Sequence, residues 1–244
     1  MRVRLSSLHA LVAASAALIV AASVHAAPVS AFGGFDHSSG AFGQRTDGWI
    51  AGASLSAAAA DVAVAGVRYD DTLIGRGTSL TGVAGVAVAP TAQLRVAATR
   101  FIGDDAFRGW RTRVGPRFSL PTGQSLWLTW VHYQDNTSVH SNGAGAEATT
   151  PLVAGLTGRA NASYATAPQG PAAIQGAVGL GWRVIPHAEL SGEVGLSRNG
   201  ASVTQPFPGG GILGPLIGGG GGSSTTTENK VATTVLLGVR VFVP

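Results

Sequence analysis

Arginine is concentrated in the stretch RGWRTRVGPRF, which begins at residue 108. Basic and bulky apolar residues alternate along it, at Trp110, Arg111, Arg113, Val114, Arg117 and Phe118. A guanidinium group is permanently charged and recognises carboxylates and phosphates. An alternation with a period of two is the β-strand period, so each type of residue occupies its own face. The stretch therefore predicts a strand with one anion-attracting face and one apolar face.

Other segments repeat this separation, with charged residues sharing one parity. The charged residues of these other segments are Arg95, Arg159, Arg183, Glu147, Glu189 and Glu193. We expect them to line an enclosed space together with Arg111, Arg113 and Arg117. Two interpretations remain open. The arginines could pair with the glutamates in a bridged, largely filled interior, or they could line water and favour anions. The excess of Arg over Glu, and the small residues elsewhere on this parity, favour the second interpretation.

The opposite parity carries the large apolar residues, and we expect it to face lipid. Reversing the assignment would place arginines against hydrocarbon, and each arginine near the midplane would then cost about 2–4 kcal/mol of stability. The residues predicted to face lipid include Trp49, Trp110, Trp130 and Trp182. With Trp127 and Tyr133 they could form aromatic girdles at the membrane interfaces. The alternative is ordinary apolar bulk at mid-depth.

One stretch contains residue types suited to hydrolysis. HSNGAGAE, from His140 to Glu147, resembles the His-x-Ser-Asn region of outer-membrane lipid A deacylases. The resemblance implies a triad of His140, Ser141 and an acid. The two residues are adjacent, however, and adjacent side chains of a strand point to opposite faces. The sequence places them in a Gly-rich loop, and a polar surface loop is the alternative interpretation.

Alternating segments of about ten residues recur from residue 49 onward, which is the pattern of transmembrane barrel strands. The clear segments are Trp49–Ala57, Asp61–Tyr69, Ser79–Ala89, Gln93–Phe101, Ala106–Leu120, Gln124–Tyr133, Ala146–Val153, Gly158–Ala165, Ala172–Val184, His187–Ser197 and Lys230–Val243. An even strand number requires one more strand, expected within Val29–Asp36. The predicted fold class is all-β: a single antiparallel up-and-down transmembrane β-barrel of about twelve strands, with ten possible.

The breaks between segments differ in length. Short breaks are expected at 89–91, 120–123, 156–158 and 185–186, and longer ones at 70–78, 103–105, 134–145, 166–171 and 198–229. Such alternation indicates short periplasmic turns on one rim and loops on the other. The Gly/Pro-rich segment 205–224 is expected to be a loop, with folding into the barrel mouth as the alternative.

The two ends of the chain indicate export. Arg2 and Arg4 precede a weakly apolar stretch and a small-residue cleavage pattern, Val24-His25-Ala26. This predicts a signal peptide at 1–26 and a barrel domain at 27–244. Residues 237–243 resemble the C-terminal insertion signal of outer-membrane β-barrel proteins, although Pro244 follows the late aromatic residue. The resemblance implies the bacterial outer membrane as location, with its lipid and the barrel-assembly machinery as partners.

Composition excludes several function classes. Charged residues are 11% of the chain, Gly numbers 36 and Cys is absent. The sequence contains no basic run with interleaved aromatic residues of the kind that indicates nucleic-acid binding. His132, His140 and His187 are too scattered to predict a metal site, no cofactor motif is found, and no feature specifies an oligomeric state. The leading expectation is a small porin-like protein with an Arg-lined lumen for weakly anion-biased diffusion. The alternatives are a non-conducting structural or surface-interaction barrel and, second, a lipid-modifying hydrolase.

Overall fold

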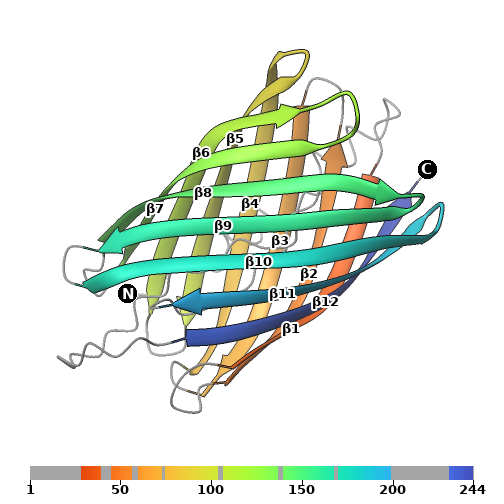
Figure 1. Cartoon of the computed structure of the whole chain (residues 1–244). Helices are drawn as coiled ribbons and strands as arrows, with labels where there is room; N and C mark the ends of the chain where they lie inside the picture. The colour runs from red at the N-terminus through yellow and green to blue at the C-terminus, as the bar shows by residue number, and fades with distance from the viewer. Residues whose placement is uncertain are drawn as a thin grey trace, which may run out of the picture.

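The chain forms a closed barrel of twelve antiparallel strands in the computed structural model (Figure 1). The structure describes residues 29–39, 45–56, 60–72, 75–103, 107–136, 140–167, 170–198 and 231–243. The strands are β1 (Val29–Ser39), β2 (Arg45–Ser56), β3 (Ala60–Asp71), β4 (Gly75–Ala89), β5 (Ala92–Gly103), β6 (Arg108–Ser119), β7 (Ser125–Asp135), β8 (His140–Val153), β9 (Leu156–Ala167), β10 (Gly170–Ile185), β11 (Ala188–Arg198) and β12 (Val231–Val243). The predicted fold class is therefore confirmed, with twelve strands and not ten. Within the described ranges no helix has the length and apolar character needed to cross a membrane.

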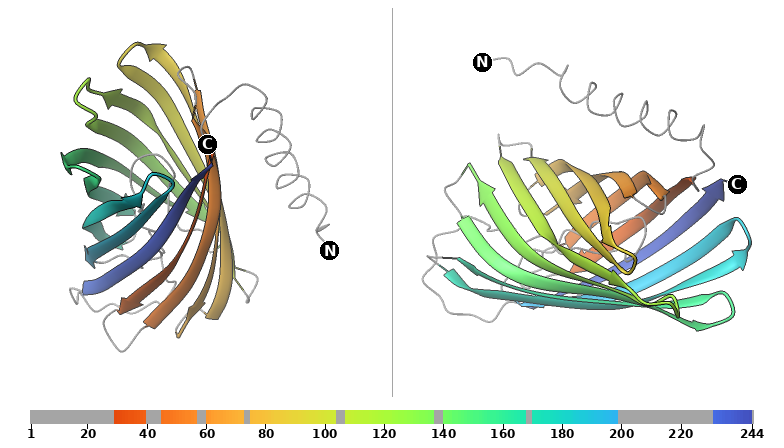
Figure 2. Two further views of the ribbon diagram at one scale, coloured as in Figure 1. Left: turned by 90° about the vertical axis from the view of Figure 1, so that its right-hand side faces the viewer. Right: turned by 90° about the horizontal axis from the view of Figure 1, so that it is seen from above.

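Closure of the barrel depends on the first and last strands. β1 pairs with β12 along its whole length, from Val29 opposite Val243 to Ser39 opposite Thr233. Every other strand pairs with its neighbours in sequence. The predicted extra strand within Val29–Asp36 is thus present as β1 and extends to Ser39. The views in Figure 2 show a wall that is a single sheet, with strands running obliquely.

The predicted alternation of short and long connections is largely wrong. Strands continue through most of the segments assigned to long loops, so only residues 72–74, 136–139 and 168–169 separate β3–β4, β7–β8 and β9–β10. Paired backbone groups are satisfied in the sheet, and polar or Gly-rich residues can extend a strand beyond the apolar region. The connection 199–230 alone is long between the twelve strands.

One short turn was also misplaced. Residues 156–158 begin β9, and the chain reverses at 154–155. Gly155 has a φ of 76°, a left-handed conformation that favours glycine in tight turns. The segment contains glycines at 155 and 158, and alternation alone did not distinguish the turn glycine from the strand glycine.

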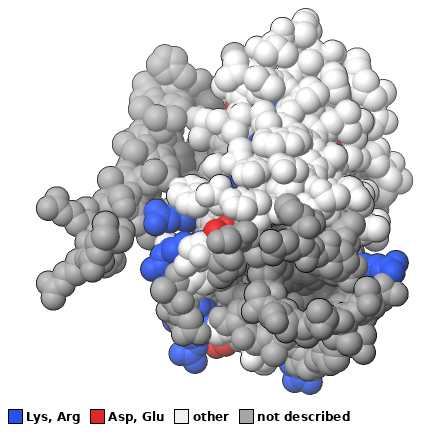
Figure 3. Space-filling view, turned by 90° about the vertical axis from the view of Figure 1, so that its left-hand side faces the viewer, with Lys and Arg blue, Asp and Glu red and all other residues white. Residues whose placement is uncertain are grey.

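The two rims of the barrel differ. We call the rim where β1 begins and β12 ends the turn rim; there the connections are 57–59, 90–91, 120–124, 154–155 and 186–187. We call the opposite rim, where the connection 199–230 joins β11 to β12, the loop rim. Outward-facing charged and histidine side chains of the described residues lie toward the loop rim: His37, Arg45, Asp47, Arg68, Asp70, Arg76, Arg100, Arg108, His132, His140 and Arg198. Figure 3 views the loop-rim end and shows charged side chains gathered beside a broad uncharged surface.

The outer wall elsewhere exposes large apolar side chains, as expected of a surface that faces lipid. Leu94, Leu128, Val178 and Leu237 are examples, with exposed fractions between 42% and 66%. The inner wall holds three apolar clusters. They are Ile50 with Val67, Ala177 and Leu236; Ala63 with Val83, Ala97 and Trp127; and Tyr69 with Phe101 and Tyr133. The predicted signal peptide 1–26 and the segment 205–224 lie outside the described residues.

Candidate functional site: the charged inner wall

Two buried ion pairs flank an indole ring on the inner wall of β3–β8. Arg95 on β5 donates to Asp61 on β3, with Nη2 and Oδ2 2.7 Å apart. Arg113 on β6 donates to Glu147 on β8. The guanidinium carbons of Arg95 and Arg113 lie 5.1 and 4.4 Å from the ring centroid of Trp127. Because these charges are almost excluded from solvent, pairing and cation–π contact compensate for their lost hydration.

The indole has a fixed position in this arrangement. Trp127 is 2% exposed, and its Nε1 donates to the carbonyl oxygen of Gly115 at 3.2 Å. Gly115 permits this approach of neighbouring groups, because a Cβ there would lie 2.0 Å from the carbonyl oxygen of Leu128. We call Asp61, Arg95, Trp127, Arg113 and Glu147 the indole cluster. Its members come from five strands, so register, and not sequence proximity, brings them together.

A second charged group occupies β9–β11. Arg159 on β9 donates to Glu189 on β11, and Asn161 Nδ2 donates to Glu193 Oε1 at 3.0 Å. These contacts span β10 because its inward positions 179 and 181 are glycine. A Cβ at Gly181 would lie 2.9 Å from Arg159 Nη2, and one at Gly179 would lie 2.9 Å from Glu193 Cβ. The glycines of β10 thus make room for polar bridges across the wall.

Three further arginines lie near the turn rim on inward positions. Arg117 on β6 is half-buried and donates to Ser125 Oγ at 3.4 Å. Arg183 on β10 is exposed and lies over Phe242, 4.5 Å from its centroid, while Arg240 on β12 lies 5.9 Å from the centroid of Phe32. β6 and β12 are separated by half of the strand ring, so this rim is basic on both sides.

Aromatic side chains occupy the interior farther toward the loop rim. Phe101 and Tyr133 lie with centroids 6.2 Å apart, and Tyr133 donates to Asp135 at 2.9 Å. Arg111, which is 1% exposed, lies 6.0 Å from the Phe101 centroid. This cluster corrects the expectation that the inner wall carries few bulky side chains.

The structure places the predicted inner-wall residues as follows. Arg95, Arg111, Arg113, Arg159, Glu147, Glu189 and Glu193 are buried, Arg117 is half-buried, and Arg183 is exposed at the turn rim. The ion pairs join Arg113 with Glu147 and Arg159 with Glu189, but the pairing partner of Arg95 is Asp61. Asp36, Asp61, Asp135 and Arg240 were not named from the sequence. Asp61 could have been found, because it has the same parity as Tyr69 and Val67 in its segment.

The tryptophans divide between the two faces. Trp49, Trp110, Trp130 and Trp182 are 69%, 50%, 50% and 57% exposed on the outer wall. Trp127 and Tyr133, considered for the girdles, are buried inside, so that assignment is wrong for both. Their parity opposite to Leu126, Leu128 and Trp130 is the sequence signal for the interior.

The segment suggested as a hydrolase site is a strand and not a loop. His140 and Ser141 begin β8, where His140 is exposed on the outer side and Ser141 is 2% exposed on the inner side. A nucleophile and its base must lie within hydrogen-bond reach, and opposite faces of one strand separate them. Among the described residues no group of three His, Cys, Asp or Glu side chains could hold a metal ion.

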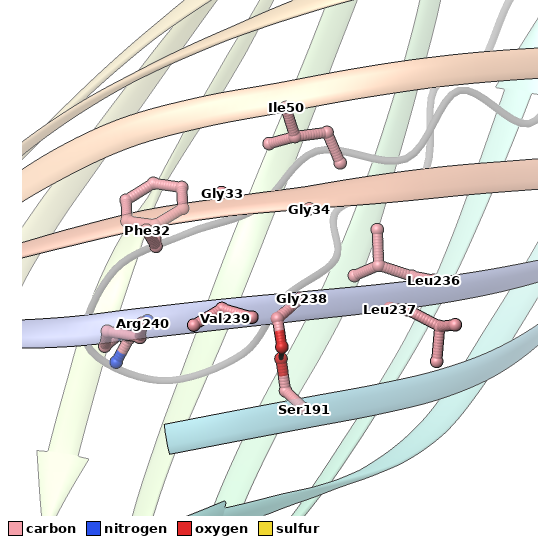
Figure 4. A pocket seen from close by; sticks show the side chains of 10 residues that line it. All are labelled: Phe32, Gly33, Gly34, Ile50, Ser191, Leu236, Leu237, Gly238, Val239 and Arg240. Atoms are coloured by element: carbon pink, nitrogen blue, oxygen red, sulfur yellow. Dashed lines mark hydrogen bonds between the residues drawn. The ribbon is translucent and has the colours of Figure 1, made fainter. Parts of the chain in front are cut away.

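A shallow depression marks the seam between β1, β11 and β12 (Figure 4). Phe32, Ile50 and Leu236 border it, and Ser191 Oγ donates across the seam to the carbonyl oxygen of Gly238 at 3.3 Å. Its lining is mostly apolar or glycine, so it contributes one charged group, Arg240, to the inner wall.

Comparison with known proteins shows similarity in fold. The sequence matches no protein-family model and no curated relative. The KdgM porin shares 11% identity and a TM-score of 0.57, covering 88% of this chain and 98% of that chain. The NanC porin shares 8% identity and a TM-score of 0.57, covering 88% and 99%. The translocator domain of the autotransporter NalP from Neisseria meningitidis shares 10% identity and a TM-score of 0.53, covering 97% and 96%.

At these identities the similarity establishes the fold alone. The chain has the twelve-stranded barrel fold of outer-membrane porins, in agreement with the sequence prediction. The same fold also serves an autotransporter. The function must therefore be inferred from the inner and outer walls of this chain.

Proposed function

We propose that this chain is a bacterial outer-membrane protein of the porin type, with a narrow path for passive diffusion of small solutes and a weak preference for anions. The observation that carries the proposal is the separation of faces in a closed barrel. Charged and polar side chains point inward from most strands, whereas large apolar side chains point outward. A polar interior and an apolar outer band are the arrangement of conducting outer-membrane barrels.

The weak anion preference rests on the charge balance of the inner wall. Its basic members are Arg95, Arg111, Arg113, Arg117, Arg159, Arg183 and Arg240, and its acidic members are Asp36, Asp61, Asp135, Glu147, Glu189 and Glu193. Seven arginines against six carboxylates leave a balance close to neutral, and three of these arginines are paired with carboxylates in the interior. The selective element is therefore the basic turn rim, formed by Arg117, Arg183 and Arg240. Rings of arginine favour anions in pores.

Conductance across a planar lipid bilayer tests this function. We expect discrete current steps from the purified folded protein, and a reversal potential of the anion-selective sign in a KCl gradient. Replacing Arg117 and Arg183 with Gln should move the reversal potential toward cation preference. The matched control replaces Arg45 and Arg198 with Gln. This removes the same amount of charge from the outer wall and should leave the reversal potential unchanged. Cation selectivity in the native protein would contradict the role of the basic rim.

A second function is favoured by a specific observation. Arg95, Arg111 and Tyr133 are 1%, 1% and 0% exposed, as in a filled interior. An interior closed by ion pairs and aromatic rings suits a non-conducting structural or surface-interaction barrel. Absence of current steps from correctly folded protein would support this alternative and contradict a diffusion path.

A further inference from the structure

Arginine gathers on the outer wall at the loop rim of β3–β6. Arg68, Thr78, Ile102 and Arg108 are consecutive cross-strand partners on β3, β4, β5 and β6. Strands are spaced about 4.8 Å apart, so Arg68 and Arg108 flank an area roughly 14 Å wide. Arg100 lies on β5 between them, two residues closer to the turn rim than Ile102 and on the same outer face, where its cross-strand partners are Leu80 and Trp110. We call Arg68, Arg100 and Arg108 the outer arginine patch.

The patch is open to the surroundings of the barrel. Arg68 and Arg108 are exposed, and neither forms an ion pair with any residue that the structure describes. Arg108 donates to the carbonyl oxygens of Gly103 and Phe107, at 3.4 and 2.7 Å. These bonds hold its guanidinium near the rim. A carboxylate does neutralise Arg76 next to the patch, because Asp70 lies 3.0 Å from it.

Arg100 is already positioned for an anion. Its guanidinium lies over Trp110, 5.3 Å from the ring centroid, and its Nε has no hydrogen-bond partner in the described part of the chain. Trp110 is 50% exposed on the same outer wall. An indole at the membrane interface beneath a guanidinium brings a charged donor to headgroup depth.

The location of the patch indicates the kind of partner. Outward charged side chains of the described residues lie at the loop rim, and the outer wall below them is apolar. Groups on this wall face lipid, so a guanidinium there meets headgroups and not a soluble anion in a cavity. The connection 199–230 lies at the same rim, and the longer connections of outer-membrane barrels face the cell exterior. Bidentate donors of this kind match phosphate.

We propose that the outer arginine patch binds the phosphorylated headgroup of a lipid in the outer leaflet. Arg68 and Arg108 contact phosphate from the two sides of the patch, and Arg100 contacts it from below while Trp110 packs against the adjoining acyl or sugar surface. This lipid site is separate from the path through the barrel, so a test of lipid binding is independent of a test of conductance.

A lipid titration followed by native mass spectrometry tests the site. The detergent-solubilised folded barrel is titrated with lipid A, which carries two phosphates, and separately with phosphatidylcholine and with inorganic phosphate. We expect saturable retention of lipid A alone. Arg100→Gln/Arg108→Gln should weaken it roughly thirtyfold, since each arginine near an anionic surface contributes a factor of about five.

The matched control removes the same charge from other strands of this rim. Arg45→Gln/Arg198→Gln changes β2 and β11 and should leave lipid A retention within about twofold of the native protein, because it spares the patch. Equal weakening by the two double variants would overturn the site in favour of a diffuse basic rim. Retention of inorganic phosphate as tightly as lipid A would overturn the lipid assignment.

A third variant works in the opposite direction. Asp70 pairs with Arg76 beside the patch. Asp70→Asn removes this carboxylate, raises the positive charge beside the patch and should tighten lipid A retention. Unchanged or weaker retention by this variant, with the fold intact by circular dichroism, would contradict an electrostatic basis for the site.

Discussion

Replacing Glu147 with Gln tests whether the indole cluster is a desolvated part of the wall. Arg113 and Glu147 are 5% and 8% exposed and form an ion pair, with Trp127 against the guanidinium. The substitution preserves shape but leaves Arg113 charged, buried and without its carboxylate. Breaking a buried pair by removing one partner costs about 3–5 kcal/mol of unfolding free energy. We expect a loss within that range for Glu147→Gln.

The measurement is a reversible urea titration of the folded barrel in lipid vesicles, followed by tryptophan fluorescence. Arg113→Gln/Glu147→Gln should recover part of the loss, since no uncompensated charge remains. The control breaks the exposed pair on the outer wall. Asp70 and Arg76 have side chains 62% and 68% exposed, and such pairs contribute about 0–1 kcal/mol, so Asp70→Asn should have little effect.

The result that would refute the reasoning is equality of the two single variants. If Glu147→Gln lost no more stability than Asp70→Asn, then water would screen Arg113 as it screens Arg76. The interior would have to be wide and wet, and the pairing would not neutralise the middle of the inner wall. A stronger anion preference from the whole barrel would then be expected.

Two further predictions concern the wall itself. Gly115→Ala places a Cβ 2.0 Å from the carbonyl oxygen of Leu128, so it should lower the folded yield in a heat-modifiability gel. The control is Gly82→Ala, which should not lower the yield because a Cβ at Gly82 has nothing within 4 Å. Equal yields of the two variants would contradict the close approach of β6 and β7. Leu128→Arg exposes a charge on the lipid face and should cost about 2–4 kcal/mol near the midplane, while Leu128→Phe should be nearly neutral in the same urea titration; comparable stability of the two would show that this position is not in hydrocarbon.

Much of the wall could be predicted from the sequence because a barrel strand is defined by local alternation. Arg111 and Arg113 face inward and Trp110 faces outward, as their parity requires. The ends of strands could not be predicted in this way. His140 to Gly145 lacks large apolar residues, yet it pairs with β7 because backbone hydrogen bonds continue where apolar contrast has stopped.

The charge partners required information that alternation does not contain. Asp61 is separated from Arg95 by 34 positions, and only the register of β3, β4 and β5 brings them together. Trp127 shows a different difficulty. A tryptophan in an apolar chain suggests an interface, but here parity outweighs residue type and places the indole between guanidinium groups.

The pairing of β1 with β12 has a consequence for how the molecule is made. Val29 lies opposite Val243 in the register of these two strands, so the ring cannot close until β12 is present. Before that moment two strand edges carry unpaired amide and carbonyl groups, which hydrocarbon does not tolerate. Removing the last strand would leave an open curved ribbon prone to self-association. Synthesis must therefore reach β12 before the ring closes, and this strand completes the barrel wall.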